Sequence, residues 1–122
     1  MKDKDRYYLV MRIKEIVKEM NKELMFVVVE GERDREVLRK LGFNKEIYLV
    51  KEVKKMKGKY TILTDFDEEG RNQALLLRKK LGDRFLIDVY RKKFFEALKD
   101  YGINEIEGIG KSLKIFKKII QL

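Results

Sequence analysis

The sequence contains no cysteine, histidine, tryptophan or proline, and its only serine is Ser112. Without cysteine and histidine, the chain lacks the ligands of the usual zinc site, a thiolate nucleophile and an imidazole base. Disulfide bonds are excluded as well, so nothing in the composition indicates secretion. Acid–base chemistry must therefore use Asp, Glu, Lys or Tyr, and any bound metal is expected to prefer oxygen ligands.

Long apolar runs are also lacking. No stretch approaches the roughly 18 apolar residues that a membrane span requires, and the N-terminal residues MKDKDRYYLV do not resemble a signal peptide. We therefore expect a cytoplasmic protein that does not bind membranes. The abundance of Lys and Glu, with only four Asn and two Gln, resembles the residue usage of thermophilic proteins.

The remaining composition is that of a folded, basic protein. The chain has 122 residues, with 30 Lys and Arg against 21 Asp and Glu, which gives a net charge of +9. Its hydrophobic fraction of 44% is too high for a disordered charged tail. We expect a single domain over 1–122, with a core at about 25–90, an N-terminal helix and C-terminal helices within 91–122.

The hydrophobic pattern predicts strands that alternate with helices. Short apolar runs predict four strands, at 24–29, 46–50, 60–64 and 84–90. Amphipathic spacing predicts helices at 4–22, 32–41, 68–81, around 94–101 and at 111–122. The basic stretch 51–57 is either a short helix or a loop. Such alternation is typical of an α/β fold with a mostly parallel sheet.

Carboxylates follow two of the predicted strands. Glu30 ends the first strand, and Asp65 and Asp67 end the third. Ligands of parallel sheets bind at the carboxyl ends of the strands, and side chains two residues apart project to the same side. If the two strands are neighbours, these acids meet in one cleft and repel each other unless a cation lies between them. Mg²⁺ is the cation that best suits such a site.

Two segments around these acids resemble the signature motifs of the Toprim domain family. They are VEGERD at 29–34 and TDFDEEG at 64–70. The family includes the catalytic domains of topoisomerases and bacterial primases, OLD-type nucleases and a maturation nuclease of ribosomal RNA. The resemblance covers about 25–90 and implies a compact, Rossmann-like fold of about four mostly parallel strands flanked by helices.

The resemblance also implies roles for the acids. Glu30 would be the general acid/base, while Asp65 and Asp67 would hold Mg²⁺ or Mn²⁺. Glu69 matches a further acid of type IA topoisomerases and would complete the metal site. The two motifs together are more specific than a lone pair of aspartates, because each follows a buried strand and precedes a helix.

Supporting roles follow in the same way. Asp34 matches an acid often found after the Glu-Gly of the first motif, and Gly31 and Gly70 match the motif glycines. Simpler interpretations stay open at this point. Asp67 also suits a helix N-cap, the two glycines suit ordinary turns, and Glu30 suits a surface acid at a strand end.

Basic residues surround the motifs. Arg33, Arg35 and Arg71 lie beside the acids in the sequence, and further Lys and Arg gather at 51–59 and 91–122. Acids flanked by bases suit a polyanion, with Arg33 and Arg71 as the candidate phosphate-binding residues. The alternative for the lysine-rich helices is an ordinary solvated face.

These features lead to a functional expectation and two alternatives. We expect a Mg²⁺-dependent protein that processes nucleic-acid phosphodiesters, most simply an endonuclease of RNA maturation or DNA repair. The alternatives are a non-catalytic module that binds metal and nucleic acid, and an accessory subunit of a larger nucleic-acid machine. We expect neither a stand-alone topoisomerase nor a primase, because their further domains and zinc module are lacking. A homodimer through helix 4–22 is an alternative to ordinary packing of that helix.

Overall fold

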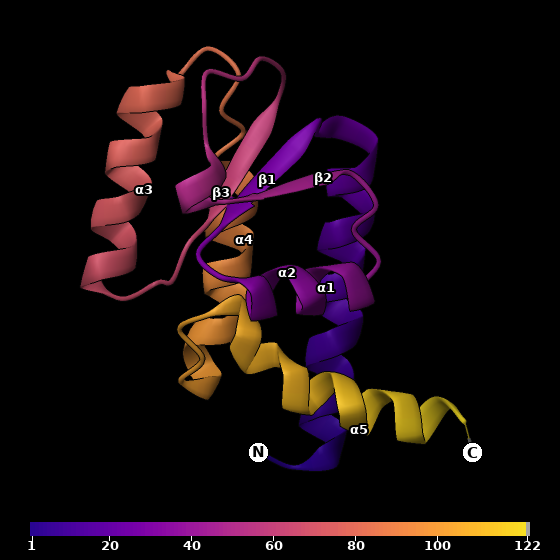
Figure 1. The fold of residues 1–122 in the computed structure, drawn as a ribbon. Coiled ribbons are helices and arrows are strands. Elements are labelled where there is room, and N and C mark those ends of the chain that lie inside the picture. The colour runs from indigo at the N-terminus through magenta and orange to yellow at the C-terminus, as the bar shows by residue number, and fades with distance from the viewer. Residues whose placement is uncertain (122) are drawn as a thin grey trace.

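A three-stranded parallel sheet lies at the centre of the structure, a computed structural model that describes residues 1–121. The strands are β1 (Phe26–Val29), β2 (Glu46–Leu49) and β3 (Tyr60–Leu63), and their order in the sheet is β2-β1-β3. Helices flank the sheet (Figure 1). The expected α/β class with a parallel sheet is therefore confirmed.

Five α-helices accompany the sheet. They are α1 (Asp3–Glu23), α2 (Glu32–Lys40), α3 (Glu68–Leu81), α4 (Val89–Leu98) and α5 (Gly110–Ile120). Short 3₁₀ helices occupy Val50–Glu52 (η1), Lys99–Tyr101 (η2) and Ile106–Ile109 (η3). The helices expected at 4–22, 32–41, 68–81 and 111–122 are thus confirmed to within two residues at each end. Periodicity identified them because each buries one apolar stripe.

The two faces of the sheet are covered unequally. On one face, Val27 and Val29 join a large core with α1, α2, α4 and α5. On the other face, Phe26 and Val28 join a smaller core that contains Leu77 of α3. Figure 1 shows α3 standing alone on its side of the sheet. All four residues of β1 are buried, which explains why its sequence lacks the alternation of a strand with one wet face.

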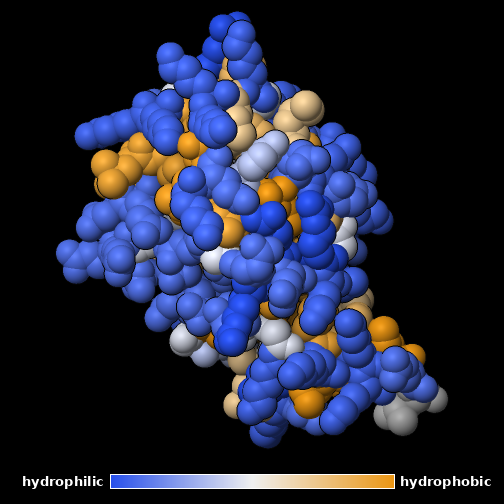
Figure 2. Space-filling view, viewed as in Figure 1, coloured by the Kyte–Doolittle hydropathy of each residue, from blue (hydrophilic) through white to orange (hydrophobic). Residues whose placement is uncertain are grey.

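The surface is largely hydrophilic, with hydrophobic atoms in several places, α3 among them. Hydrophobic atoms gather over this helix in the view of Figure 2. Two of its leucines are well exposed, Leu75 at 58% and Leu76 at 66%. No helix within residues 1–121 is long and apolar enough to cross a membrane.

The fourth strand expected at 84–90 is wrong. A single parallel bridge joins Leu86 to Tyr60, and helix α4 begins at Val89. Tyr90 lies inside this helix and is buried together with Phe94 and Leu98. The helical spacing of these three residues therefore outweighs the β propensity of the run RFLIDVY, because it places all of them in the large core.

Arg91 covers part of the sheet edge that a fourth strand would have paired. Its Nη1 atom donates to the backbone carbonyl oxygens of Ile62 at 3.1 Å and Thr64 at 2.9 Å. Its Nη2 atom donates to the carbonyl oxygen of Asp65 at 2.9 Å. Backbone acceptors at a buried edge need partners, and one guanidinium from α4 supplies three of them.

Helix α3 begins against the end of β3, and this close approach requires glycine at position 70. A Cβ atom on Gly70 would lie 2.0 Å from the carbonyl oxygen of Asp65. The hydroxyl of the buried Thr64 donates to the carbonyl oxygen of Gly70 at 2.7 Å. The loop that carries Asp65 is therefore held between a strand and a helix that almost touch.

Replacing Gly70 with alanine should destabilise the protein. We expect Gly70→Ala to lower the free energy of unfolding by about 1–3 kcal/mol, because backbone must move to admit the methyl group. Gly31→Ala is the matched control, since its Cβ atom would meet only Asp34 Oδ2 at an ordinary 3.7 Å. The control should stay within about 0.5 kcal/mol of wild type. Denaturant titration measures both, and equal stability of the two variants would contradict the close approach.

Candidate functional site

Glu30 and Asp65 meet at the carboxyl edge of the sheet. They follow β1 and β3, which are adjacent and paired with Val29 opposite Leu63. Glu30 Oε1 accepts a hydrogen bond of 3.0 Å from the backbone N–H of Asp65. Both side chains are half-buried. Parallel pairing of the two strands thus brings together the first acid of each motif.

Negative charge accumulates around Asp65. Burial, followed by the neighbouring carboxylate of Glu30, raises the pKa of Asp65 to about 7. The charges of Asp34 and Glu105 also raise the pKa of Asp65, each by less than Glu30 does. Asp65 therefore changes charge near neutral pH, which is a property of functional carboxylates as well as of crowded structural ones.

Asp34 anchors the turn that follows Glu30. It is only 5% exposed, and its two carboxylate oxygens accept from the backbone N–H groups of Gly31 at 3.0 Å and Glu107 at 2.8 Å. Burial nevertheless raises the pKa of Asp34 above its usual value. Because both oxygens hold backbone, Asp34 supports the site by joining the start of α2 to η3.

Asp67 caps helix α3. Its Oδ1 atom accepts from the backbone N–H of Gly70 at 2.8 Å, and the side chain is otherwise exposed. The capping interpretation of Asp67 is therefore confirmed, and it commits one of the two carboxylate oxygens. Glu69 lies exposed in the first turn of α3 and is not among the groups that perturb Asp65. Asp67 and Glu69 thus lie outside the Glu30–Asp65 contact.

The donor set suits a hard cation in its chemistry. Glu30 and Asp65 offer only carboxylate oxygens, and a cation between them would offset the burial and the neighbouring charge that raise the pKa of Asp65. Mg²⁺ needs only one or two carboxylates from a protein and completes its shell with water and phosphate oxygens. In the part of the chain that the structure describes, no three acidic side chains are grouped to hold a metal. A cation between Glu30 and Asp65 would thus have two protein carboxylates and would take its other ligands from water or phosphate.

Two further acids at the site were not identified from the sequence. Glu105 and Glu107 flank the start of η3, and burial together with Glu107 and Asp34 raises the pKa of Glu105. Their spacing repeats that of Asp65 and Asp67, yet no buried strand precedes them. The link is tertiary, because the backbone N–H of Phe66 donates to the carbonyl oxygen of Asn104 at 2.6 Å.

The candidate phosphate-binding arginines lie on either side of the acids. Arg33 is exposed at the start of α2 and pairs with Glu107 at 3.2 Å. Arg71 is exposed on α3, and its Nη1 atom donates to the carbonyl oxygen of Phe66 at 3.2 Å. Arg35, by contrast, pairs with Glu52. Arg33 and Arg71 thus stand at the rim of the site, where a polyanion would reach them.

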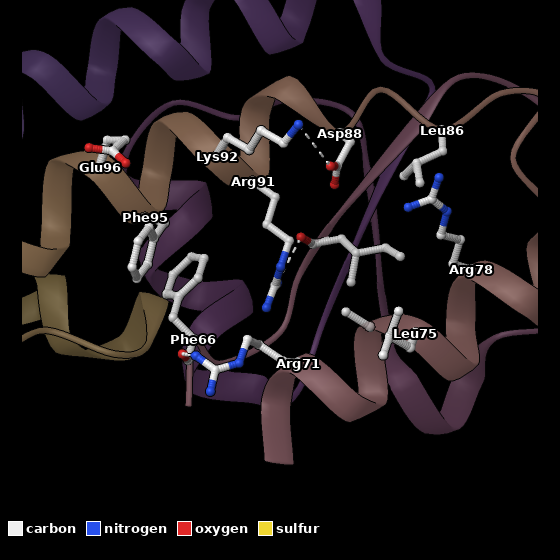
Figure 3. A pocket seen from close by; sticks show the side chains of 12 residues that line it. Phe66, Arg71, Leu75, Arg78, Leu86, Asp88, Arg91, Lys92, Phe95 and Glu96 are labelled. Atoms are coloured by element: carbon white, nitrogen blue, oxygen red, sulfur yellow. Dashed lines mark hydrogen bonds and ion pairs between the residues drawn. The ribbon is translucent and has the colours of Figure 1, made fainter. Parts of the chain in front are cut away.

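Arg91 places a further positive charge beneath the acids. Its guanidinium lies 4.8 Å from the centre of the Phe66 ring, and Figure 3 shows it projecting from α4 toward Phe66. Burial lowers the pKa of Arg91 from its usual value, although Asp88, Glu30 and Asp65 oppose that change. Phe66 itself is 5% exposed, as expected for a residue that packs beneath the two aspartates.

The ionisation of Asp65 should make stability depend on pH. The folded protein holds a proton on Asp65 between about pH 4 and 7 that the unfolded chain releases, so stability falls as pH rises through this window. Asp65→Asn removes the charge that faces Glu30, Asp34 and Glu105. We expect the variant to exceed wild type by about 1 kcal/mol at pH 8, allowing for solvent screening, and to match it at pH 4. Thermal unfolding at both values checks this, and an equal difference at the two pH values would contradict it.

No protein-family model, curated protein or solved structure matches the chain. The acids Glu30 and Asp65 and the residues around them are therefore the basis for a functional proposal.

Proposed function

We propose that this protein is a Mg²⁺-dependent nucleic-acid phosphodiester-processing enzyme, most simply a Toprim-type endonuclease of RNA maturation or DNA repair. The observation that carries the proposal is the contact between Glu30 and Asp65 at the carboxyl edge of two adjacent parallel strands. Carboxylate pairs of this kind are a common means of holding Mg²⁺ beside a phosphodiester. The motifs that resemble Toprim domains supply the same two residues.

A basic groove beside the acids supports a polyanionic substrate. It lies between α2 and α5 and encloses about 700 Å³. Its cationic lining residues are Arg33, Lys40, Lys111, Lys114, Lys117 and Lys118. Two acids, Glu36 and Glu107, also line it, and Glu107 is already paired with Arg33. The groove thus carries an excess of positive charge along α5, which suits the phosphates of a bound strand.

Each residue of the site would have its own role in the proposed reaction. Asp65 and Glu30 would hold the metal, which would supply charge stabilisation to the phosphate under attack, while Asp67 uses its Oδ1 atom to cap α3 and lies outside this pair. Glu30 would also be the group that moves the proton, the role that the resemblance to Toprim domains implies for it. Arg33 and Arg71 would hold phosphates on either side of the reacting one.

Removing either acid of the pair should abolish cleavage. We expect a panel of structured RNAs and DNAs to be cut only with Mg²⁺ or Mn²⁺, and Glu30→Gln and Asp65→Asn to reduce the rate at least ~100-fold. Glu68→Gln is the matched control, since Glu68 lies exposed in the first turn of α3 and should leave the rate unchanged. Robust cleavage by both acid variants would refute the proposal.

A second measurement separates metal binding from catalysis. Mg²⁺ should raise the melting temperature of the wild type and leave that of Asp65→Asn unchanged, because only the wild type offers the carboxylate pair. The rise in melting temperature that Mg²⁺ causes in the wild type should shrink below pH 7, where the proton on Asp65 competes with the cation. A metal effect in wild type without cleavage of any substrate would favour the non-catalytic binding module. The capping role of Asp67 and the absence of a third grouped acid within residues 1–121 are the observations that favour this alternative.

The basic groove should contribute to binding through charge alone. We expect the double variant Lys114→Gln/Lys118→Gln to weaken duplex binding and to reduce the slope of log K against log salt by about two. Lys18→Gln/Lys79→Gln is the matched control, because both lysines are exposed outside the groove, on α1 and α3. Anisotropy titrations at several salt concentrations measure the slopes. Equal slopes for the two double variants would show that the groove does not hold the phosphates.

A further inference from the structure

A second groove lies between α3 and α4. It crosses the sheet edge left open by the missing fourth strand and encloses about 570 Å³. This volume lies within the range of ligand-binding pockets. Its apolar surface comes from Ile62, Phe66, Leu75, Leu86 and Phe95. Of its lining residues, the function proposed above uses only Arg71.

Two aromatic rings form one end of the groove. The rings of Phe66 and Phe95 lie 5.9 Å apart and are tilted by 48°. Figure 3 shows them side by side, with Leu75 and Leu86 toward the opposite end. Phe95 is 39% exposed although it is a large aromatic residue in a chain with only 11% aromatics. Lys99 lies 5.9 Å from the centre of this ring, and the exposed part of the side chain offers aromatic surface to a planar group.

The acids that line the groove are already paired. Asp88 lies 3.7 Å from Lys92, and Glu96 lies 2.8 Å from Lys99. The contact between Asp88 and Lys92 is drawn in Figure 3. In each pair the lysine offsets the charge of the carboxylate, so these two acids repel an anionic ligand less than free carboxylates would.

Two cations of the groove have no acidic partner. Arg71 and Arg91 both line it, and neither forms an ion pair within residues 1–121. Arg91 lies over the ring of Phe66, and Arg71 contacts the carbonyl oxygen of the same residue. The excess positive charge therefore lies at the aromatic end of the groove, next to Phe66, the residue that follows Asp65 in the chain.

From this arrangement we infer that the α3–α4 groove holds one unstacked base of a single-stranded nucleic acid, with an adjoining phosphate on Arg71. A planar apolar slot with cations at one end matches a base and its phosphate, and stacking on aromatic rings serves RNA and DNA alike. A paired base inside a duplex presents neither of its faces to such a slot. The inference rests on the proposed function, because it names the form of substrate that reaches the Glu30–Asp65 pair.

The test compares two phenylalanines of nearly equal exposure. Phe95 is 39% exposed and lines the groove, whereas Phe85 is 37% exposed and lies outside its lining. The probe is a fluorescently labelled single strand of about ten nucleotides, and the duplex of the same sequence is the comparison. Binding of each is measured by fluorescence anisotropy, in EDTA so that no cleavage occurs. We expect Phe95→Ala to weaken single-strand binding about tenfold and to leave duplex binding unchanged. Phe85→Ala should alter neither.

A second pair of variants covers the case in which Phe95→Ala is too unstable to measure. Leu75 lines the groove and Leu76 does not, although they are neighbours on the exposed face of α3. Leu75→Glu and Leu76→Glu add the same charge to the same helix. Only Leu75→Glu should reduce single-strand binding, again about tenfold, because it places a carboxylate inside the groove, one helical turn from Arg71, where it repels the anionic strand and competes with it for that arginine.

The outcomes distinguish this inference from the proposed function. Undetectable single-strand binding by the wild type would overturn the inference, and so would equal effects of Phe95→Ala on single strand and duplex. Cleavage that requires Glu30, together with Phe95→Ala binding like wild type, would leave the proposed function standing and the groove without its ligand. A Phe95-dependent single-strand affinity in a protein that cuts nothing would support the groove and refute the nuclease.

Discussion

The guanidinium of Arg91 holds together the region on which the site depends. Strand β3 is an edge strand beyond Tyr60, and its carbonyl groups at Ile62 and Thr64 accept from this one side chain. A fourth strand would satisfy the same acceptors with its own N–H groups, and it would also fill the space between α3 and α4. Because a side chain does this instead, the edge is satisfied and the space beside it remains a groove. The same cation lies beneath Asp65, so the sheet edge, the groove and the acidic site share one anchor.

The sequence was sufficient for the elements and for the principal contact of the site. Helices α1, α2, α3 and α5 followed from periodicity, and the contact between Glu30 and Asp65 followed from two strands ending in acids. It was not sufficient for the fourth strand, because the run at 84–90 has strong β propensity while the pattern that makes α4 begins inside it. Arg91 gave no signal either, since an arginine on an amphipathic helix ordinarily faces solvent. Its role depends on a strand about 30 residues earlier, which local patterns do not reveal.

Two grooves of different chemistry lie on the protein. The groove between α2 and α5 is lined by six Lys and Arg side chains, a composition that favours phosphates without regard to the groups they carry. The groove between α3 and α4 has aromatic and aliphatic walls, with two arginines at one end that form no ion pair within residues 1–121. We therefore propose that the first groove would supply affinity for phosphates and the second a preference for a flat group.

The Glu30–Asp65 pair itself works against folding. Burying two carboxylates side by side costs free energy, and the raised pKa of Asp65 records that cost as a proton retained to near neutral pH. The surrounding structure tolerates it because both loops are firmly fixed, one by Asp34 to η3 and the other by the close approach of Gly70. A structural acid pair gains nothing from such rigidity, since moving one loop outward would relieve the repulsion. A site that must present two carboxylates to a cation gains from it directly, because preorganised ligands need no rearrangement when the ion binds. Two acids that merely end neighbouring strands do not need to be held in this way, so the hydrogen bond of Asp34 and the close approach at Gly70 support the proposed cation site.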